Sequence, residues 1–451
     1  MDSLPRLALA IPSTSPAPTA ACLAMLAGLT ARRWRVQHFA TRARPFGHVA
    51  VAQVTGLPGR HLDHWLMDPQ VCREVFARGA QHADLALVEG TLEEISLSSG
   101  HYPYVRPGRL GPIAEALDLP KVALLECRTA ESLHLPRLPR QIDAILIDGL
   151  ENREDFEAIR RTISLLLKKP VLGAVEALPD CRAALAASLP DQPIPIEVLG
   201  RLGASFLQFA DLAALRSLSE SRLFPGDINP APPRGGRRFR VAYAQDEAFG
   251  GYFPDTLETL EALGAELVEF SPLRDEALPE AVDLVMIGCG FPDRYAEPLA
   301  ENHCLITALR AHVCQGHRIY AEGGGTAYLG RSMILDGRRV PGAGILPFDA
   351  ELRAHPRGPY PVRRVLTGDG WLGPAGTEVR GYHSGRWKLR PAPDPCDCPA
   401  RSGTLTRQGD IYFRRHAVGS LIHLHLASLP EVVRAFVGPP QPYLVPPRAH
   451  H

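Results

Sequence analysis

The chain has 451 residues, of which 45% are hydrophobic, and its 49 basic side chains balance 49 acidic ones. This length predicts two large domains or three small ones, and the charge balance gives no indication of binding to nucleic acid or an acidic membrane. Nine irregularly spaced cysteines, no secretory signal at the start and no apolar run of membrane-spanning length predict a soluble cytoplasmic protein with reduced thiols.

Short apolar runs alternate with longer helical patterns in the first half of the chain. Helical patterns cover residues 19–33 and 153–169. Strand-like runs alternating with helices are typical of βαβ units, in which a parallel sheet is buried on both faces. The runs are RLALAI, DLALVEG, KVALLE, AILIDG and PVLGAV, at residues 6–11, 84–90, 121–126, 144–149 and 170–175.

A stretch rich in proline and glycine, FPGDINPAPPRGGRR at 224–238, interrupts this alternation. It indicates a linker, which we place at 216–238. The alternation then resumes, so we expect one domain at 1–215, a second at 239–443 and a tail at 444–451. In the second domain we expect strands at 239–245, 267–270 and 283–292, and helices at 255–265 and 302–316.

The segment YAEGGGTAYLG, at 320–330, is predicted to form a strand, a glycine turn and a helix. This is how α/β enzymes present a nucleophile on an exposed elbow, yet the elbow position here is Gly323. Because glycine carries only hydrogen, no side chain can attack a substrate from that position.

The first strand–helix junction, at residues 10–26, occupies the place of a phosphate-binding loop in α/β domains. Thr19 stands where such a loop has its magnesium-binding hydroxyl, but Pro18 precedes it where lysine is expected, and the glycines are missing. The junction therefore allows two interpretations, a plain helix start without ligand or an eroded nucleotide site.

The chain resembles the cobyrinic acid a,c-diamide synthases, glutamine-dependent amidases of corrinoid and related tetrapyrrole biosynthesis. The resemblance covers about residues 1–438 and is most extensive at 241–293, 320–330 and 420–437, with shorter matches in the first half such as TGLPGRHLDHWLM at 55–67. It implies two tandem three-layer α/β domains. The first is a P-loop domain similar to dethiobiotin synthetase, and the second is a class I glutamine amidotransferase-like domain.

The resemblance also implies a glutaminase site in the second domain. The family elbow is Ala-Glu-Cys-Gly-Gly, whereas this chain has Ala-Glu-Gly-Gly-Gly at 321–325, so the thiol that attacks glutamine is absent from it. His423 is the expected residual base, and Gly288, Gly290 and Gly324 are the expected oxyanion and turn residues. A replacement nucleophile needs elbow geometry and a base within hydrogen-bond reach. We expect Cys289 to be a buried, inert thiol that shapes the turn.

In the first domain the family motif Ser-Gly-Ser-Gly-Lys-Thr-Thr corresponds to TSPAPTA at 14–20. The resemblance assigns the residual phosphate and magnesium contacts to Thr19, Asp63 and Glu89. Without the lysine and the glycines, ATP and magnesium are expected as cofactors only if this site survives.

Three hypotheses follow from the two eroded loops. The favoured one is a catalytically degenerate homologue that serves as a subunit binding a tetrapyrrole, an active homologous amidase or a second copy of itself. The second is an amidoligase that uses free ammonia and a non-standard nucleotide site. The third is a reassigned enzyme, which uses the elbow backbone to bind an acyl group and His423 as the base.

Three further patterns concern metal or cofactor binding, and the first two predict no site. PCDCP at 395–399 has no second cysteine or histidine pair at zinc spacing, and His450 and His451 fall in the tail. His423 and His425 alternate on a predicted strand, so they are either a cofactor ligand pair or structural residues of that strand.

Overall fold

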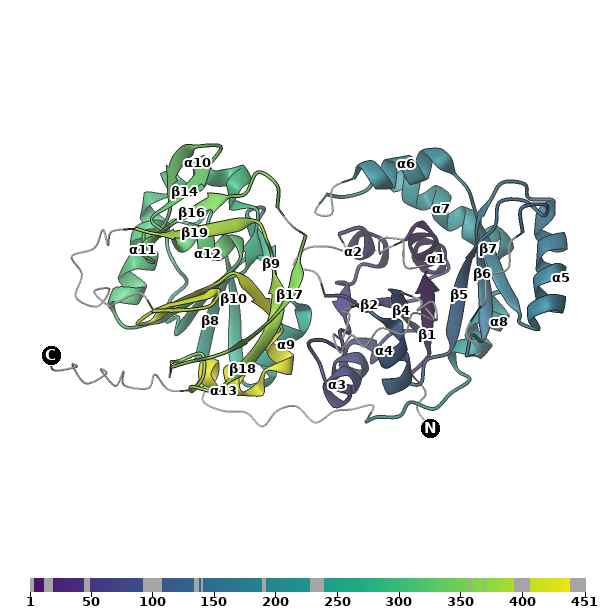
Figure 1. Cartoon of the computed structure of the whole chain (residues 1–451), viewed down its shortest axis with the longest axis horizontal. Helices are drawn as coiled ribbons and strands as arrows, with labels where there is room; N and C mark the ends of the chain where they lie inside the picture. The colour runs from purple at the N-terminus through teal and green to yellow at the C-terminus, as the bar shows by residue number, and fades with distance from the viewer. Residues whose placement is uncertain are drawn as a thin grey trace, which may run out of the picture. The chain divides into compact units, whose positions relative to one another are not determined.

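The computed structural model describes residues 4–11, 19–43, 49–91, 108–133, 138, 141–188, 192–227, 239–356, 358–368, 370–392 and 406–438. The described elements form two compact units, from β1 to α8 and from β8 to α13 (Figure 1). Each unit is built on a seven-stranded sheet, which confirms the predicted class of two tandem α/β domains.

The first sheet is entirely parallel, in the order β3-β2-β4-β1-β5-β6-β7. Every residue of β1 and β2 is buried, as expected for strands covered on both faces. The strands are β1 (Arg6–Ile11), β2 (Val36–Ala40), β3 (Arg60–His61), β4 (Leu85–Thr91), β5 (Lys121–Glu126), β6 (Ala144–Leu150) and β7 (Val171–Glu176).

Helices cover both faces of this sheet, with α1, α2 and α7 on one side and α3 and α4 on the other (Figure 1). Thr19 caps α1 by accepting a hydrogen bond from the Cys22 N–H, which fixes the start of the helix. The helices are α1 (Ala20–Ala31), α2 (Val49–Thr55), α3 (Pro69–Ala80), α4 (Leu110–Ala116), α5 (Asp155–Leu167), α6 (Pro179–Ala187), α7 (Ile196–Phe209) and α8 (Leu212–Ser219).

One predicted boundary needs correction. The composition predicts a linker at 216–238, but residues 216–219 complete α8. The proline-rich composition begins only at Phe224, whereas the apolar spacing of Leu212, Leu215 and Leu218 continues the helical pattern beyond residue 215.

The second sheet has the order β10-β8-β11-β13-β22-β21-β20. Its first five strands are parallel, and β21 and β20 add an antiparallel edge. The strands are β8 (Phe239–Ala244), β10 (Ala265–Phe270), β11 (Leu284–Ile287), β13 (Arg318–Glu322), β20 (Thr406–Gln408), β21 (Ile411–Arg414) and β22 (Ala417–Ser420).

Alternating residues of the central strands feed two separate cores, one on each face of this sheet. Ile319 and Ala321 of β13 enter the core that includes α11 and α12, whereas Tyr320 enters the core that includes α9 and α13. The helices are α9 (Pro254–Ala262), α10 (Ala296–Glu301), α11 (His303–Cys314), α12 (Gly324–Leu329) and α13 (Pro430–Val437), with short 3-10 turns η1 (Pro292–Tyr295) and η2 (Leu426–Ser428).

Three small sheets complete the second unit, and one of them carries His423. That sheet has the order β17-β18-β23, the second pairs β9 with β12, and the third has the order β15-β14-β16-β19. The strands are β9 (Phe249–Gly251), β12 (Cys289–Gly290), β14 (Ser332–Leu335), β15 (Arg338–Pro341), β16 (Phe348–Leu352), β17 (Tyr360–Val365), β18 (Glu378–His383), β19 (Trp387–Pro391) and β23 (Ile422–Leu424).

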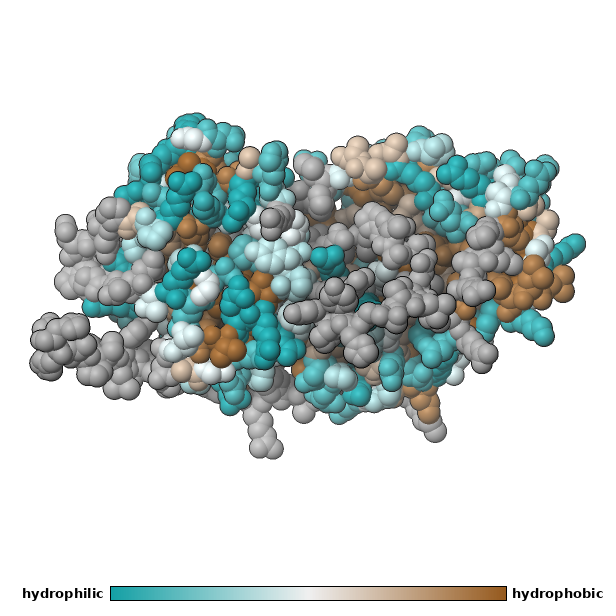
Figure 2. All heavy atoms as spheres, viewed as in Figure 1, coloured by the Kyte–Doolittle hydropathy of each residue, from teal (hydrophilic) through white to brown (hydrophobic). Residues whose placement is uncertain are grey.

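The surface is mixed in polarity, with an apolar patch at the position of α5 (Figure 2). Leu165 and Leu166 of this helix are 77% and 64% exposed. Among the described helices, none alone has the length and composition to cross a membrane; the bent pair of α7 and α8 meets those two criteria together.

Candidate functional site

The elbow at Gly323 forms as the sequence predicts. Strand β13 ends at Glu322, α12 begins at Gly324, and Gly323 between them has φ of +51°. A β-carbon at Gly323 would lie 2.8 Å from the Sγ atom of Cys289. The thiol of Cys289 therefore occupies the space into which a side chain at the elbow would extend.

Cys289 comes from β12, at the turn that follows β11, and it is 1% exposed. Its Sγ lies 3.5 Å from Nδ1 of His423, within the hydrogen-bond reach for sulfur. The predicted burial of Cys289 is confirmed. The thiol of Cys289 lies beside the elbow and next to the imidazole of His423.

Glu322 completes the cluster and orients the imidazole of His423. Its Oε2 is hydrogen-bonded to His423 Nδ1, and its Oε1 accepts from Tyr320 Oη at 2.6 Å and from the Leu424 N–H at 3.1 Å. Tyr320 and Glu322 lie on the same face of β13 because side chains alternate along a strand. Sequence reasoning gave Glu322 no role, although a carboxylate in the buried run RIYAE was the available signal.

Burial and charge set the protonation of this cluster. Burial opposes a proton on His423, but Cys289 and Glu322 outweigh that effect and raise the pKa of His423 to about 10. Burial also raises the pKa of the Cys289 thiol, while the neighbouring His423 acts in the opposite direction. The folded protein therefore favours the charged imidazolium of His423, and Glu322 supplies the opposite charge that faces it.

A small cavity adjoins the cluster. Nε2 of His423 is buried and has no partner among the described residues, and the ring of His423 stacks on Phe253 at 4.1 Å between centroids. His423 is one of the residues that line the cavity. The cavity is lined by Tyr252, Phe253, Thr256, Met286, Ile287, Gly288, Tyr320, Glu322, His423, Leu424 and Leu426.

The three predicted oxyanion and turn glycines all lie in this region. The Gly288 N–H donates to Tyr252 Oη at 2.8 Å, and Gly290 pairs with Phe249 of β9. Gly324 begins α12. An oxyanion role for Gly288 would require its N–H to exchange that hydrogen bond for one to a ligand.

His425 does not act together with His423. Strand β23 ends at Leu424, and Nε2 of His425 lies 3.6 Å from Oδ2 of Asp255, whereas His423 contacts Glu322. The two imidazoles contact different carboxylates. This favours the interpretation of His423 and His425 as structural residues over that of a cofactor ligand pair.

In the first unit the structure brings together Thr19 and Glu89. Glu89 lies near the carboxyl end of β4, and its Oε1 accepts from the Thr19 N–H at 2.8 Å and from Thr19 Oγ1 at 2.9 Å. The carboxylate thereby takes hydrogen bonds at the start of α1, where a nucleotide-binding domain receives phosphate oxygens.

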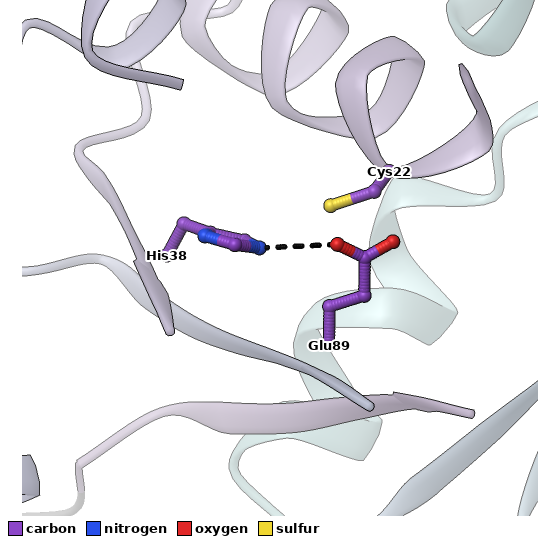
Figure 3. Close-up of side chains that lie close together, drawn as sticks. All are labelled: Cys22, His38 and Glu89. Carbon is purple, nitrogen blue, oxygen red and sulfur yellow. Dashed lines mark hydrogen bonds and ion pairs between the residues drawn. The ribbon is translucent and has the colours of Figure 1, made fainter. Parts of the chain in front are cut away.

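Two residues that sequence reasoning missed join Glu89, namely Cys22 and His38 (Figure 3). Nε2 of His38 lies 3.4 Å from Oε2 of Glu89, and one potential ligand atom from each of the three residues lies within 4.8 Å of the others. Burial, followed by the charge and hydrogen bond of Glu89, raises the pKa of the Cys22 thiol. A thiol and an imidazole within apolar segments were the only signals in the sequence.

Asp63 is fully buried, and its carboxylate accepts hydrogen bonds from nearby backbone N–H groups. Its Oδ2 accepts from the Ala43 N–H at 3.0 Å, and its Oδ1 accepts from the Trp65 N–H at 2.9 Å. Magnesium prefers oxygen ligands and phosphate, but Glu89 is surrounded by a thiol and an imidazole. The described residues therefore do not form a site that fits magnesium and ATP.

Residues 12–18, 393–405 and 439–451, which include the thiols of PCDCP and the final histidines, lie outside the described residues.

Comparison with known proteins identifies the family. Residues 240–430 match the model of the CobB/CobQ-like glutamine amidotransferase domain. The chain is 30% identical over 458 aligned residues to the cobyrinate a,c-diamide synthase of Syntrophotalea carbinolica, with 96% of this chain and 98% of that protein covered. The chain belongs to the cobyrinate a,c-diamide synthase family.

Other members of the cobyrinate a,c-diamide synthase family match over shorter or more divergent alignments. The enzyme of Magnetococcus marinus is 31% identical, with 79% of each chain covered. The hydrogenobyrinate a,c-diamide synthase of Streptomyces coelicolor is 27% identical over 97% of both chains. The alignments that cover nearly the whole chain span both units, so the family relationship applies to the Glu89 region as well as to the elbow.

Proposed function

We propose that this protein is a reassigned member of its family, in which Cys289 and His423 carry out thiol-dependent amide chemistry in place of a side chain at the elbow. One observation carries the proposal: Cys289 Sγ lies beside Gly323 and 3.5 Å from His423 Nδ1. A thiol beside an imidazole is the pairing of an activated nucleophile, and Glu322 contacts the same Nδ1 atom, so proton transfer from the thiol requires Nδ1 to exchange the carboxylate for the sulfur.

The reaction takes a primary carboxamide such as glutamine. The neutral form of His423 removes the proton from the Cys289 thiol, and the sulfur attacks the carbonyl carbon. His423 then gives that proton to the nitrogen, the C–N bond breaks, and ammonia leaves. Water hydrolyses the thioester, which releases the carboxylic acid and restores the thiol.

The names of the relatives support a tetrapyrrole carboxylate as the acceptor of the ammonia. In this proposal the protein acts in cobalamin-type biosynthesis within the cytoplasm. A partner, either an active homologue or a second copy of this chain, would supply the nucleotide-dependent activation of the carboxylate. The described residues around Glu89 do not fit magnesium and ATP.

The test measures glutamate release from glutamine by the purified full chain, with and without cobyrinate and ATP. We expect release by the native protein and at least a hundredfold loss in Cys289→Ala. Cys304→Ser is the matched control, because Cys304 is an exposed thiol of α11 outside the cluster. An electrophilic glutamine analogue should label Cys289, as located by peptide mass spectrometry. Label on another cysteine, or equal release by Cys289→Ala, would contradict the proposal.

A second candidate, the degenerate binding subunit, is supported by the burial of the cluster. Cys289, Glu322 and His423 are 1%, 5% and 2% exposed. This candidate predicts no glutamate release under any condition, together with saturable binding of cobyrinate detected by its absorption spectrum. The two measurements together separate the candidates.

A further inference from the structure

We infer that Cys22, His38 and Glu89 form a binding site for a thiophilic divalent cation such as Zn²⁺ or Co²⁺. The three side chains come from α1, β2 and β4 and converge in Figure 3. This inference goes beyond the proposed function, because the site lies in the other unit and does not involve Cys289.

The fold explains why these residues meet. Strands β2 and β4 are parallel neighbours, with His38 in register with Leu87. Glu89 follows Leu87 by two residues, so His38 and Glu89 point to the same face of the sheet. Cys22 lies in the first turn of α1, and its buried side chain belongs to the core on that face, together with Leu87.

The geometry suits a tetrahedral ion. Two nitrogen or oxygen ligands at about 2.1 Å from zinc lie about 3.4 Å apart in a tetrahedral arrangement. His38 Nε2 and Glu89 Oε2 are 3.4 Å apart, and a ligand atom of Cys22 lies within 4.8 Å of both residues. Three protein ligands leave a fourth position for water or a substrate atom.

The donors also suit the charge and softness of such an ion. Thiolate, imidazole and carboxylate together select zinc or cobalt over magnesium. All three side chains are fully buried, and a divalent ion would neutralise the thiolate and the carboxylate. Binding releases the proton of the Cys22 thiol to solvent.

A second layer of contacts already orients the carboxylate. Both donors of Thr19 bind Oε1 of Glu89, which leaves Oε2 directed at His38. Outer hydrogen bonds of this kind fix the orientation of ligands in metal sites. The competing account is a hydrogen-bonded cluster without an ion, in which His38 donates to Glu89.

The test titrates Co²⁺ into the metal-free full chain carrying Cys289→Ala, which removes the thiol of the other cysteine–histidine–glutamate cluster. We expect one equivalent of Co²⁺ to give a thiolate-to-cobalt absorption band in the near ultraviolet, and Zn²⁺ to abolish it. Adding Cys22→Ser should remove the band, and adding His38→Ala should weaken binding at least tenfold.

Cys72→Ser is the matched control, because Cys72 is a buried thiol of the same unit outside the cluster. It should retain the band. Native mass spectrometry of the parent protein with Zn²⁺ provides a readout that does not depend on how well a variant folds. If no ion is retained there, or if the band persists in Cys22→Ser, the inference is overturned.

Discussion

The sulfur of Cys289 lies 2.8 Å from the point where a β-carbon would stand at Gly323, so the thiol and an elbow side chain exclude each other. A thiol is thereby retained beside the elbow although residue 323 carries none. Gly323 and Cys289 therefore depend on each other for packing.

Gly323→Cys alone should destabilise the protein by about 2–4 kcal/mol, because it adds both overpacking and strain at positive φ. Gly337→Cys is the matched control, since Gly337 has φ of +81° and no atom within 4 Å of an added β-carbon. It should cost only about 1 kcal/mol. The measurement is urea unfolding, and equal losses in the two variants would rule out the crowding by Cys289.

The double variant Cys289→Gly with Gly323→Cys should recover at least about 1 kcal/mol relative to the sum of the single changes, because it removes the clash. It also transfers the thiol to the elbow. If it releases glutamate from glutamine, the pocket still accepts glutamine. Additive losses in a double-mutant cycle would show that the two positions do not interact.

Stability should fall as the pH rises above neutrality. The pKa of His423 is raised to about 10 in the folded protein, so its contribution is full below the ordinary value near 6.5 and is lost between about pH 6.5 and 10. The raised pKa of Cys289 acts in the same direction above about pH 8.5.

The slope attributable to His423 should approach about 1.4 kcal/mol per pH unit within this window. Unfolding free energies of the native chain and His423→Gln, measured from pH 6 to 9, provide the check. The difference between the two proteins should shrink as the pH rises. A difference that stays constant would mean that folding does not raise the pKa of His423.

Glu322→Gln should destabilise the protein by about 2–3 kcal/mol and flatten the same pH profile, because it removes the charge that faces His423. Tyr243 and Glu269 offer a matched pair, with the same 2.6 Å hydrogen bond at an exposed position. Glu269→Gln should therefore change stability by less than about 1 kcal/mol and leave the pH profile unaltered. If neither substitution changes the stability or its pH profile, Glu322 does not orient His423.

Thr19→Val should destabilise the first unit by about 1–2 kcal/mol, because it removes the helix cap and one hydrogen bond to Glu89. Asp68→Ala tests a cap alone, at the exposed start of α3, and should cost about 1 kcal/mol. Thermal unfolding of both variants gives the comparison. A smaller loss for Thr19→Val than for Asp68→Ala would contradict the role of Thr19 in holding Glu89.

The periodicity of the sequence predicted the fold well, because alternating strands and helices have local causes. RLALAI and KVALLE became β1 and β5 at the predicted residues, since a covered parallel strand needs a continuous apolar run. The helical turn at 216–219 falls inside the predicted linker, because a helix with regular apolar spacing continues to the start of the proline-rich stretch. The sequence alone also shows that the elbow lacks a side chain, because this depends only on the identity of residue 323.

The candidate sites depended on contacts that no local pattern contains. Cys289 and His423 are 134 positions apart, and they meet only because the turn after β11 and strand β23 both reach the end of β13. His38 and Glu89 meet through the register of two parallel strands. The sequence determined which groups are present and which are missing. Only the tertiary structure decided which of these groups are buried next to one another. Burial and short distances between them then set their proton affinity and their capacity to bind a metal ion.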